Sequence, residues 1–549
     1  MLFISPAESR FGGAFSHYMP LSQPVAIGTL AAWLIKHDIN SAVLDDQVTT
    51  VTPSVIREKV QGLDEPYIFG ITCMTAHVAR AYPIAKMIRA EFPNSIIVAG
   101  GLHPTALPAE PLGTGLFDYV LRGESELPIL KLHEAIRNGY GFEKVPSLTY
   151  MQDGKLINNP EGPMLLNLDD LPMFPHHLMM DKRYERGFLI SSRGCPYKCT
   201  YCSQRMMTGT TYRYKSAERI VAEVEELVNK FGEKLIMFYD DNFCVKNGRV
   251  IDICNLILEK GLQKKTQFTI QTRADNFPES LVPLMAESGF KQVIFGVETG
   301  TNRLADIISK DESIETHNEA IALAQKHGIS VSLAMIYGLP TERSEDREIG
   351  FKYVMSHNAH SPKFNNLVPY PGTPLYSDLK KSNRLIVTKD WGNFDSTLSG
   401  TNTIFQRTPL AYVPETCSEW ELKRDIVRNN IRANLTIRNI INLTYGRGEF
   451  SWLKLPDKWY FKPTEVFHLF MALFILFTNM IVTYLPLWLT EPIMHLIQPS
   501  MKKRVRIKDP KISMSYKPSG WSPTSGKLKA ELLAFARKEQ KGREVARVN

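Results

Sequence analysis

The chain has 549 residues, of which 44% are hydrophobic and 22% are charged, with 34 Gly and 34 Pro. This composition excludes a wholly disordered, a collagen-like and a multi-span membrane protein, and the length predicts about two to four domains. The net charge of +8 is uneven, because residues 501–549 hold 14 Lys or Arg against 4 Asp or Glu while the rest of the chain is close to neutral. A basic tail on a nearly neutral body favours a solvated or surface-binding extension. Since this tail has few aromatic residues and no recognisable RNA module, nucleic acid is not an expected partner.

Cysteine usage points to a reducing compartment. The seven cysteines, at positions 73, 195, 199, 202, 244, 254 and 417, are an odd number in a large chain. The first residues form an apolar, strand-like run with no charged n-region and no cleavage pattern, so we expect no secretory signal and no disulfide framework. We therefore expect a cytoplasmic protein, in which a cluster of three thiols suggests a metal site.

Residues 1–139 alternate short β-rich runs with helical stretches, which predicts a parallel sheet covered on both faces. Ligands of such open sheets bind at the carboxyl ends of the strands. Two turns at those ends stand out, one containing Gly100, Gly101 and Thr105 and the other containing Gly123 and Glu124. The predicted strands are Leu2–Ser5, Ser41–Leu44, Tyr67–Thr72, Ser95–Ala99 and Tyr119–Leu121, and the predicted helices are Ser22–His37, Ala76–Glu91 and Leu127–Arg137.

Residues 140–184 are rich in Pro, Asn and Asp, which predicts a linker with a short β excursion at Ser147–Asn159. Strand–helix alternation resumes over residues 185–390. Six β–α units fall short of the eight in a full barrel, so we expect an incomplete one. Its predicted strands are Phe188–Ser191, Leu235–Tyr239, Gln267–Gln271, Val293–Gly296, Ser330–Ile336 and Asn366–Val368, and its predicted helices are Ser216–Lys230, Arg249–Lys260, Pro278–Ser288 and Ile314–His327.

Residues 391–500 form a helical C-terminal region, with a helix predicted at Ser418–Arg438, and residues 501–549 are the basic tail. Within this region Val466–Thr490 contains no Asp, Glu, Lys or Arg and is long enough to cross a bilayer. A pair of buried helices interrupted at Pro486 would have an equally apolar sequence. Because both flanks are basic, we expect this segment to dip into one leaflet at the inner face of the membrane rather than to cross it.

The segment after the first barrel strand carries the most specific signal. Cys195, Cys199 and Cys202 lie at spacings of four and three on one Gly-Pro loop. Iron–sulfur cubanes are bound by Cys thiolates, and three of them leave one iron open for a substrate or cofactor. Structural zinc would require a fourth ligand at typical spacing, and the remaining pair, Cys244 and Cys254, is separated across a strand–helix junction.

The CxxxCxxC loop on a partial barrel resembles the radical S-adenosylmethionine superfamily, over roughly residues 187–371. This resemblance implies a [4Fe-4S] cluster whose open iron chelates S-adenosyl-L-methionine, with Tyr201 as the aromatic residue before the third cysteine. From the strand ends we expect Glu298 to accept hydrogen bonds from a ribose or amine and Arg273 to pair with the cofactor carboxylate. Asp240 or Asp241 would face the substrate or the amine, and Gly338 follows the fifth strand. The Gly-Gly-Glu element of many superfamily members is missing.

The N-terminal region resembles the cobalamin-binding domains that are joined to such barrels. Gly100, Gly101, Thr105, Gly123 and Glu124 are the residues through which this resemblance implies cobalamin binding. The Asp-x-His-x-x-Gly string that supplies a lower ligand to cobalt is absent, so His103 is expected to be a hydrogen-bonding loop residue. The expected fold is therefore α/β, with a Rossmann-like cobalamin-binding domain, a partial (β/α)6 barrel and a helical C-terminal region.

The resulting hypothesis is a cobalamin-dependent radical enzyme that methylates an unactivated carbon of a small-molecule or lipid substrate. The deoxyadenosyl radical would abstract hydrogen, methylcobalamin would supply the methyl group, and an external one-electron reductant would be required. Two alternatives stay open at this point. One is an oxidative cyclase like the anaerobic magnesium-protoporphyrin ester cyclase, and the other is a non-catalytic cobalamin or iron–sulfur sensor.

Overall fold

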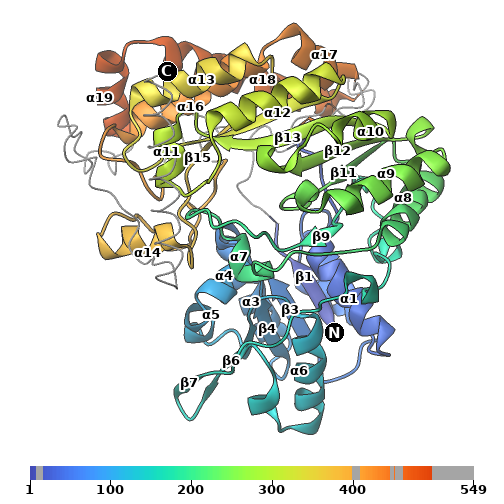
Figure 1. Cartoon of the computed structure of the whole chain (residues 1–549). Coiled ribbons are helices and arrows are strands. Elements are labelled where there is room, and N and C mark those ends of the chain that lie inside the picture. The colour runs from blue at the N-terminus through green and yellow to red at the C-terminus, as the bar shows by residue number, and fades with distance from the viewer. Residues whose placement is uncertain (8–16, 398–407, 446–449, 452–454, 456–461, 498–549) are drawn as a thin grey trace, which may run out of the picture.

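The computed structural model describes all residues except 8–16, 398–407, 446–449, 452–454, 456–461 and 498–549. It contains two parallel sheets, each covered by helices, and a helical C-terminal layer (Figure 1). The N-terminal sheet lies at one end of the molecule and the C-terminal helices lie at the other, with the second sheet between them. The basic tail lies outside the described residues.

The N-terminal sheet has seven strands in the order β2-β1-β3-β4-β5-β6-β7. The first five are parallel, and β6 and β7 are added antiparallel at the edge, so the hairpin predicted in the linker belongs to this sheet. The strands are β1 (Leu2–Ser5), β2 (Ala42–Asp45), β3 (Ile68–Thr72), β4 (Ile96–Gly100), β5 (Tyr119–Leu121), β6 (Leu148–Gln152) and β7 (Lys155–Asn158).

Both faces of the parallel part of this sheet, β1 to β5, are buried, as a parallel sheet requires. On β1, Phe3 faces the core under α1 and α6, whereas Leu2 and Ile4 face the core under α2 and α3. The helices are α1 (Val25–Lys36), α2 (Pro53–Lys59), α3 (Val78–Glu91), α4 (Leu102–Ala106), α5 (Ala109–Gly113) and α6 (Glu126–Asn138), of which α2, α4 and α5 were not predicted.

The second sheet has six parallel strands in the order β15-β14-β13-β12-β11-β8, which is a partial barrel. Its strands are β8 (Phe188–Leu189), β11 (Leu235–Phe238), β12 (Gln267–Thr272), β13 (Phe290–Glu298), β14 (Ser330–Tyr337) and β15 (Lys363–Asn366). A two-stranded antiparallel ribbon, β9 (Ser192–Arg193) and β10 (Arg213–Tyr214), lies between β8 and β11 in the sequence. The helices are α7 (Gln204–Thr208), α8 (Ala217–Phe231), α9 (Asn247–Glu259), α10 (Val282–Glu287), α11 (Asn302–Ile307), α12 (Ile314–Lys326), α13 (Ser344–Ser356) and α14 (Pro374–Lys381).

Local sequence explains why these helices form. In α8 the side chain of Ser216 accepts a hydrogen bond from the backbone N–H of Arg219 as the N-cap, and Gly232 ends the helix in the left-handed conformation. The buried face comprises Ile220, Val221, Val224, Leu227 and Val228, at the spacing of one helical stripe. This stripe packs with the strands into the largest hydrophobic core of the protein.

Two barrel strands differ from the prediction for physical reasons. The first ends at Leu189 instead of Ser191, because the backbone N–H of Ser191 donates to Asp240 (2.6 Å) rather than to a neighbouring strand. The sixth lies at Lys363–Asn366 rather than at residues 366–368. The sequence of this strand is polar and gives no apolar strand pattern. At its free edge, the backbone N–H of Phe364 donates to the Asn430 side chain, and the backbone carbonyl of Phe364 accepts from it.

The C-terminal layer contains α16 (Glu419–Asn434), α17 (Ile437–Tyr445), α18 (Pro463–Tyr484) and α19 (Leu487–Ile497). Helix α16 packs on β15 and α13, and α18 runs along α16. Among the described residues α18 is the one helix with the length and apolarity needed to cross a membrane, and only 17% of its most apolar window is buried. The break predicted at Pro486 separates α18 from α19.

Candidate functional site

The three-cysteine loop begins directly after β9 and is held by backbone contacts. Gly194, at φ 86°, starts the loop, and a Cβ there would collide with the carbonyl of Thr211, so only glycine fits. In the middle of the loop, the backbone N–H and the hydroxyl of Thr200 both donate to the carbonyl of Ile308, at 2.9 and 3.2 Å. These contacts fix the loop between β9 and the turn that follows α11.

Cys195, Cys199 and Cys202 are free and partly exposed, whereas the other four cysteines are free and buried. Within the described ranges no group of three His, Cys, Asp or Glu side chains surrounds one metal-ion position. A cubane does not need such a group, because each thiolate binds a different iron. Three free thiols on one loop are a donor set that a cubane can use.

Burial raises the pKa of all three thiols, and for Cys199 the nearby cations Lys310 and Arg273 oppose this effect. Because burial disfavours the charged thiolate form, these cysteines require a positive charge near the loop in order to act as thiolate ligands.

Arg273 follows β12, as predicted, and is engaged by other groups of the protein. Its guanidinium lies 3.5 Å from the centre of the Tyr197 ring on the cysteine loop. Its nitrogens also pair with Asp275 (2.9 Å) and donate to the carbonyl of Lys310 (2.7 Å), so the predicted pairing with a cofactor carboxylate would have to displace existing partners. Arg273 thus connects the cysteine loop to the loop after α11.

The two aspartates after β11 have opposite environments. Asp240 is 2% exposed and accepts hydrogen bonds from the backbone N–H and the hydroxyl of both Ser191 and Ser192, at 2.5 to 3.2 Å. The carboxylate oxygens of Asp240 are therefore occupied by hydrogen bonds from Ser191 and Ser192, which precede the cysteine loop. Asp241 instead lines the cavity described below, and burial followed by the charge of Asp240 raises its pKa to about 7. Of the two predicted candidates, Asp241 is the one that can face a ligand.

Glu298 ends β13 with a left-handed backbone (φ 68°) and contacts Tyr201, the aromatic residue beside the third cysteine. Burial raises its pKa, and Lys310, with its Nζ atom 3.8 Å from Oε1, opposes that shift. Gly338 lies further away, where its N–H donates to Glu342 (2.5 Å) and a Cβ would meet Leu422. Gly338 therefore shapes a turn and does not line the cavity.

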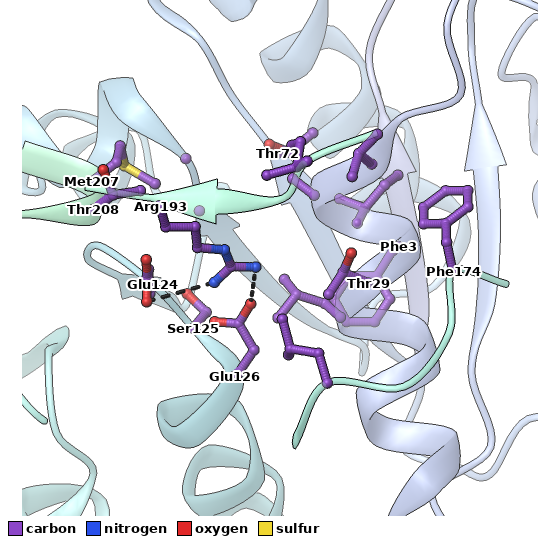
Figure 2. A pocket seen from close by; sticks show the side chains of 18 of the residues that line it. Phe3, Thr29, Thr72, Glu124, Ser125, Glu126, Phe174, Arg193, Met207 and Thr208 are labelled. Atoms are coloured by element: carbon purple, nitrogen blue, oxygen red, sulfur yellow. Dashed lines mark ion pairs between the residues drawn. The ribbon is translucent and has the colours of Figure 1, made fainter. Parts of the chain in front are cut away.

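A cavity of about 450 Å³ lies between the two sheets. Gly100, Gly101 and Gly123 from the N-terminal strand ends line it. Arg193, Met207 and Thr208, which flank the cysteine loop, also line it (Figure 2). Gly101 has φ 97°, and a Cβ there would be 2.9 Å from the carbonyl of Cys73. The wall is mainly apolar, with Phe3, Leu30, Ile129, Leu171 and Phe174 among its members.

Charged side chains join the two domains across this cavity. Arg193, beside the cysteine loop, points at Glu124 (3.5 Å) and Glu126 (2.8 Å) at the start of α6 (Figure 2). Arg213 on β10 binds the same Glu124 through two contacts of 2.7 Å. The predicted cofactor residue Glu124 is therefore mainly an interdomain ion-pair acceptor that also lines the cavity.

Thr105 and His103 both stabilise the turn after β4. The hydroxyl of Thr105 accepts from the N–H of Gly123 (2.9 Å) and lies 3.5 Å from the sulfur of Met207 on α7. His103 is fully buried, lies 3.4 Å from Glu110 and packs edge-on against Trp391. Burial lowers its pKa to about 4, so it is a neutral interior residue. It does not line the cavity.

Sequence reasoning missed four residues that organise the site, namely Arg193, Arg213, Glu126 and Lys310. Arg193 and Arg213 flank the cysteine motif and Glu126 follows the Gly123 turn, so their positions next to recognised motifs were a usable signal. Lys310 is distant in sequence from every motif, and no pattern pointed to it.

Comparison with known proteins gives matches in both domains. Residues 189–352 match the radical SAM superfamily and residues 19–132 match the B12 binding domain. An uncharacterized methyltransferase of Pyrococcus horikoshii is 30% identical over 400 residues, which cover 72% of this chain and 85% of the relative. An anaerobic magnesium-protoporphyrin IX monomethyl ester cyclase of Rubrivivax gelatinosus is 25% identical, covering 69% and 70%. A hopanoid C-3 methylase of Methylococcus capsulatus is 27% identical, covering 58% and 61%.

The overall arrangement is also found in a solved structure. The radical S-adenosylmethionine methyltransferase TsrM from Kitasatospora setae, with cobalamin and a [4Fe-4S] cluster bound, superposes with a TM-score of 0.61. The alignment covers 86% of this chain and 90% of that one at 18% identity. The predicted α/β architecture is confirmed.

Proposed function

Because the chain belongs to the cobalamin-dependent radical S-adenosylmethionine methyltransferases, we propose that it methylates an unactivated carbon of a lipidic substrate. The cofactors of the family are a [4Fe-4S] cluster, S-adenosyl-L-methionine and cobalamin. The observation that carries the proposal is an interdomain cavity lined by Arg193 and Gln204, which flank the cysteine loop, and by Gly100, Gly101 and Gly123 of the B12 domain.

Cys195, Cys199 and Cys202 would bind three irons of the cluster. Their fit rests on three partly exposed free thiols on one loop that two separate elements hold in place, with Arg273 and Lys310 supplying positive charge nearby. Tyr201 on this loop and Glu298, which contacts it, would position the bound S-adenosylmethionine.

Gly100, Gly101 and Gly123 would contact cobalamin, because their missing side chains let a bulky planar ligand approach the sheet edge. His103 is buried behind this edge and does not line the cavity, so it would not contact the bound cobalamin.

When bound, the cluster and S-adenosylmethionine supply a radical that abstracts hydrogen, and cobalamin supplies the methyl group. The chain's own task is to keep the reacting carbon between the two groups and away from water. The apolar wall of the cavity excludes water, and the Arg193 ion pairs to Glu124 and Glu126 fix the separation of the domains. Asp241, one of the ionisable groups that line the cavity, would orient a polar part of the substrate. Electrons would come from an external one-electron reductant.

Two observations support a lipidic substrate. A hopanoid methylase is among the relatives, and the apolar helix α18 leaves most of its surface exposed. We further propose that the enzyme is cytoplasmic and works at the inner face of the membrane. The second candidate reaction is an oxidative cyclisation, which the similarity to the magnesium-protoporphyrin ester cyclase over 69% of the chain favours.

The test is anaerobic incubation of the reconstituted enzyme with S-adenosylmethionine and a reductant. We expect 5′-deoxyadenosine from the parent protein and none from Cys199→Ala. Cys254→Ala, which alters a buried core thiol, is the matched control and should retain iron and activity. An intact cluster without 5′-deoxyadenosine would instead indicate a sensor.

The reaction type is tested in cells that produce the parent or Cys199→Ala. Lipid and pigment extracts should differ by a methylated lipid. A lost cyclised pigment would favour the cyclase, and identical extracts would contradict both reactions.

A further inference from the structure

The helix α18 presents two faces of opposite character. Its back stripe, at helical spacing, includes Leu469, Ala472, Leu476, Asn479 and Thr483, and it packs on α16 and on Tyr18 of the N-terminal domain. Its outer face is apolar and exposed. That face comprises Val466, Phe467, Phe470, Met471, Leu473, Phe474, Phe477, Ile481 and Tyr484.

The apolar face continues past the break at Pro486. On α19, Trp488 is 76% exposed and Leu496 is 77% exposed, while Thr490 and Met494 pack inward. We call the exposed apolar residues of α18 and α19 the platform. Isolated apolar residues on a surface are ordinary, but a contiguous set of this size marks an interaction site.

Polar bonds fix the platform to the body of the enzyme. The Arg424 side chain on α16 donates to the carbonyls of Thr483 (2.8 Å) and Leu485 (3.3 Å), which satisfies the carboxyl end of α18. The indole N–H of Trp420, a fully buried residue of α16, donates to the hydroxyl of Thr490 on α19 (2.9 Å). Both helices therefore lie along α16 instead of projecting from the protein.

Helix α16 itself cannot enter a bilayer. Its Asp425 binds the fully buried Arg347 of α13 (2.7 Å), and its Asn430 pairs with the backbone of β15. If α18 crossed the membrane in its present contact with α16, this charged helix and the barrel edge would have to follow it into hydrocarbon. Crossing would thus require α18 to break its bonds with Arg424 and to leave its back stripe exposed.

We infer that the platform binds one leaflet of a lipid bilayer, with α18 and α19 parallel to the membrane plane. Apolar helices bound in this way enter only the boundary between headgroups and acyl chains, and they prefer anionic lipid when positive charge lies beside them. Positive charge is available in the sequence that follows α19 directly, where residues 501–549 carry 14 Lys or Arg against 4 Asp or Glu. The opposite end of the molecule, with the β6–β7 hairpin, would face the cytosol (Figure 1).

This orientation deepens the proposed function, because it would let a lipid move from the leaflet to the enzyme. Vesicle binding is measured without turnover, so its failure and a failure of methylation are distinguishable. The probe is phosphatidylcholine vesicles with and without phosphatidylglycerol, sedimented with the full-length reconstituted enzyme. We expect binding that phosphatidylglycerol strengthens and that high salt weakens.

The variant Phe470→Glu/Phe474→Glu/Phe477→Glu changes three residues that are 64%, 57% and 58% exposed, so it should fold. We expect its vesicle partition coefficient to fall about tenfold or more, while 5′-deoxyadenosine formation in detergent-free buffer stays unchanged. The matched control is Tyr140→Glu/Leu166→Glu, which alters apolar residues outside the platform that are 72% and 73% exposed, and it should bind like the parent. Equal binding of the triple variant and the parent would overturn the inference.

Two further measurements distinguish the in-plane orientation from a span and from a protein partner. In inside-out membrane vesicles from producing cells, added protease should remove a C-terminal tag completely, and a protected tag would indicate a span. The fluorescence of Trp488, isolated by subtraction of Trp488→Phe, should be quenched most by lipids brominated near the headgroup. A stable dimer that hides Trp488 and shows no vesicle binding would also overturn the inference.

Discussion

The guanidinium of Arg273 stacks on the ring of Tyr197, 3.5 Å from its centre, and so joins the end of β12 to the cysteine loop. The Tyr197 hydroxyl in turn accepts from the Asn276 side chain (2.7 Å). Cation–π contacts of this kind are strongest where they are shielded from water, and Arg273 is only 6% exposed. The relationship makes Arg273 a positioning residue for the loop.

Arg273→Gln should therefore loosen the cluster. We expect faster loss of iron to a chelator, by several-fold, with partial recovery in Arg273→Lys because the charge is kept while the planar stacking is lost. Arg303→Gln, which breaks an exposed pair with Asp346, is the control and should release iron at the parent rate. A raised KM for S-adenosylmethionine with unchanged iron release would instead support the predicted carboxylate contact.

Substitution of the two adjacent aspartates should have different effects, on the stability of the protein at Asp240 and on its activity at Asp241. Asp240→Ala removes the acceptor for four hydrogen bonds from Ser191 and Ser192 and should lower the thermal unfolding midpoint by roughly 5 to 10 °C. Asp241→Ala should unfold near the parent temperature and lose product formation. A lower unfolding midpoint for Asp241→Ala than for Asp240→Ala would contradict these roles.

Glu124→Gln should weaken the contact between the domains. Glu124 is the shared acceptor of Arg213 and Arg193, and breaking a buried ion pair typically costs about 3 to 5 kcal/mol. We expect a lower unfolding midpoint and faster loss of cobalamin absorbance during gel filtration. Glu134→Gln breaks an exposed pair with Lys131 and should change neither quantity. Equal cobalamin retention by both variants would show that these ion pairs do not hold the domains together.

The N-terminal domain should be sensitive to acid. Burial lowers the pKa of both His103 and His176 to about 4, below the ordinary value of about 6.5. Since the unfolded chain takes up these protons first, stability is retained above pH 6.5 and falls as the pH drops toward 4, by up to about 1.4 kcal/mol per pH unit for each histidine.

The measurement is the unfolding midpoint between pH 7.5 and 5. His176→Gln should show a weaker pH dependence than the parent. An unchanged slope in this variant would mean that His176 is not a source of the acid sensitivity.

Much of the fold follows from the sequence because its strands are buried and apolar. Leu2–Ser5 and Tyr119–Leu121 coincide with β1 and β5, and the helices of both sheets differ from their predictions mainly at the ends. Helices α2, α4 and α5 were not predicted, and two barrel strands differ because side chains satisfy part of their backbone. Ser191 binds Asp240 and Phe364 binds Asn430, and such pairings between distant residues leave no local pattern.

The loops that form the site could be predicted from the sequence, but the partners of the individual side chains could not. The cysteines and Gly100, Gly101 and Gly123 lie at the strand ends that the motifs indicated, whereas Gly338 does not line the cavity. Arg273 and Asp240, however, are engaged within the protein, and Glu124 carries the interdomain pairs. Sequence identifies which loops meet at a sheet edge, whereas the partner of each charged group depends on residues brought in from another domain.

Helix α7 has a consequence for grafting one domain of this protein onto another. It begins two residues after Cys202, and its Met207 touches Thr105 in the turn after β4 while Met206 occupies the space that a Cβ on Gly372 would need. The five residues of α7 thus act as a spacer that fixes the distance between the N-terminal domain and the barrel. A chimera that exchanges the N-terminal half alone would inherit a mismatched spacer, so a functional exchange must carry residues 204–208 with it.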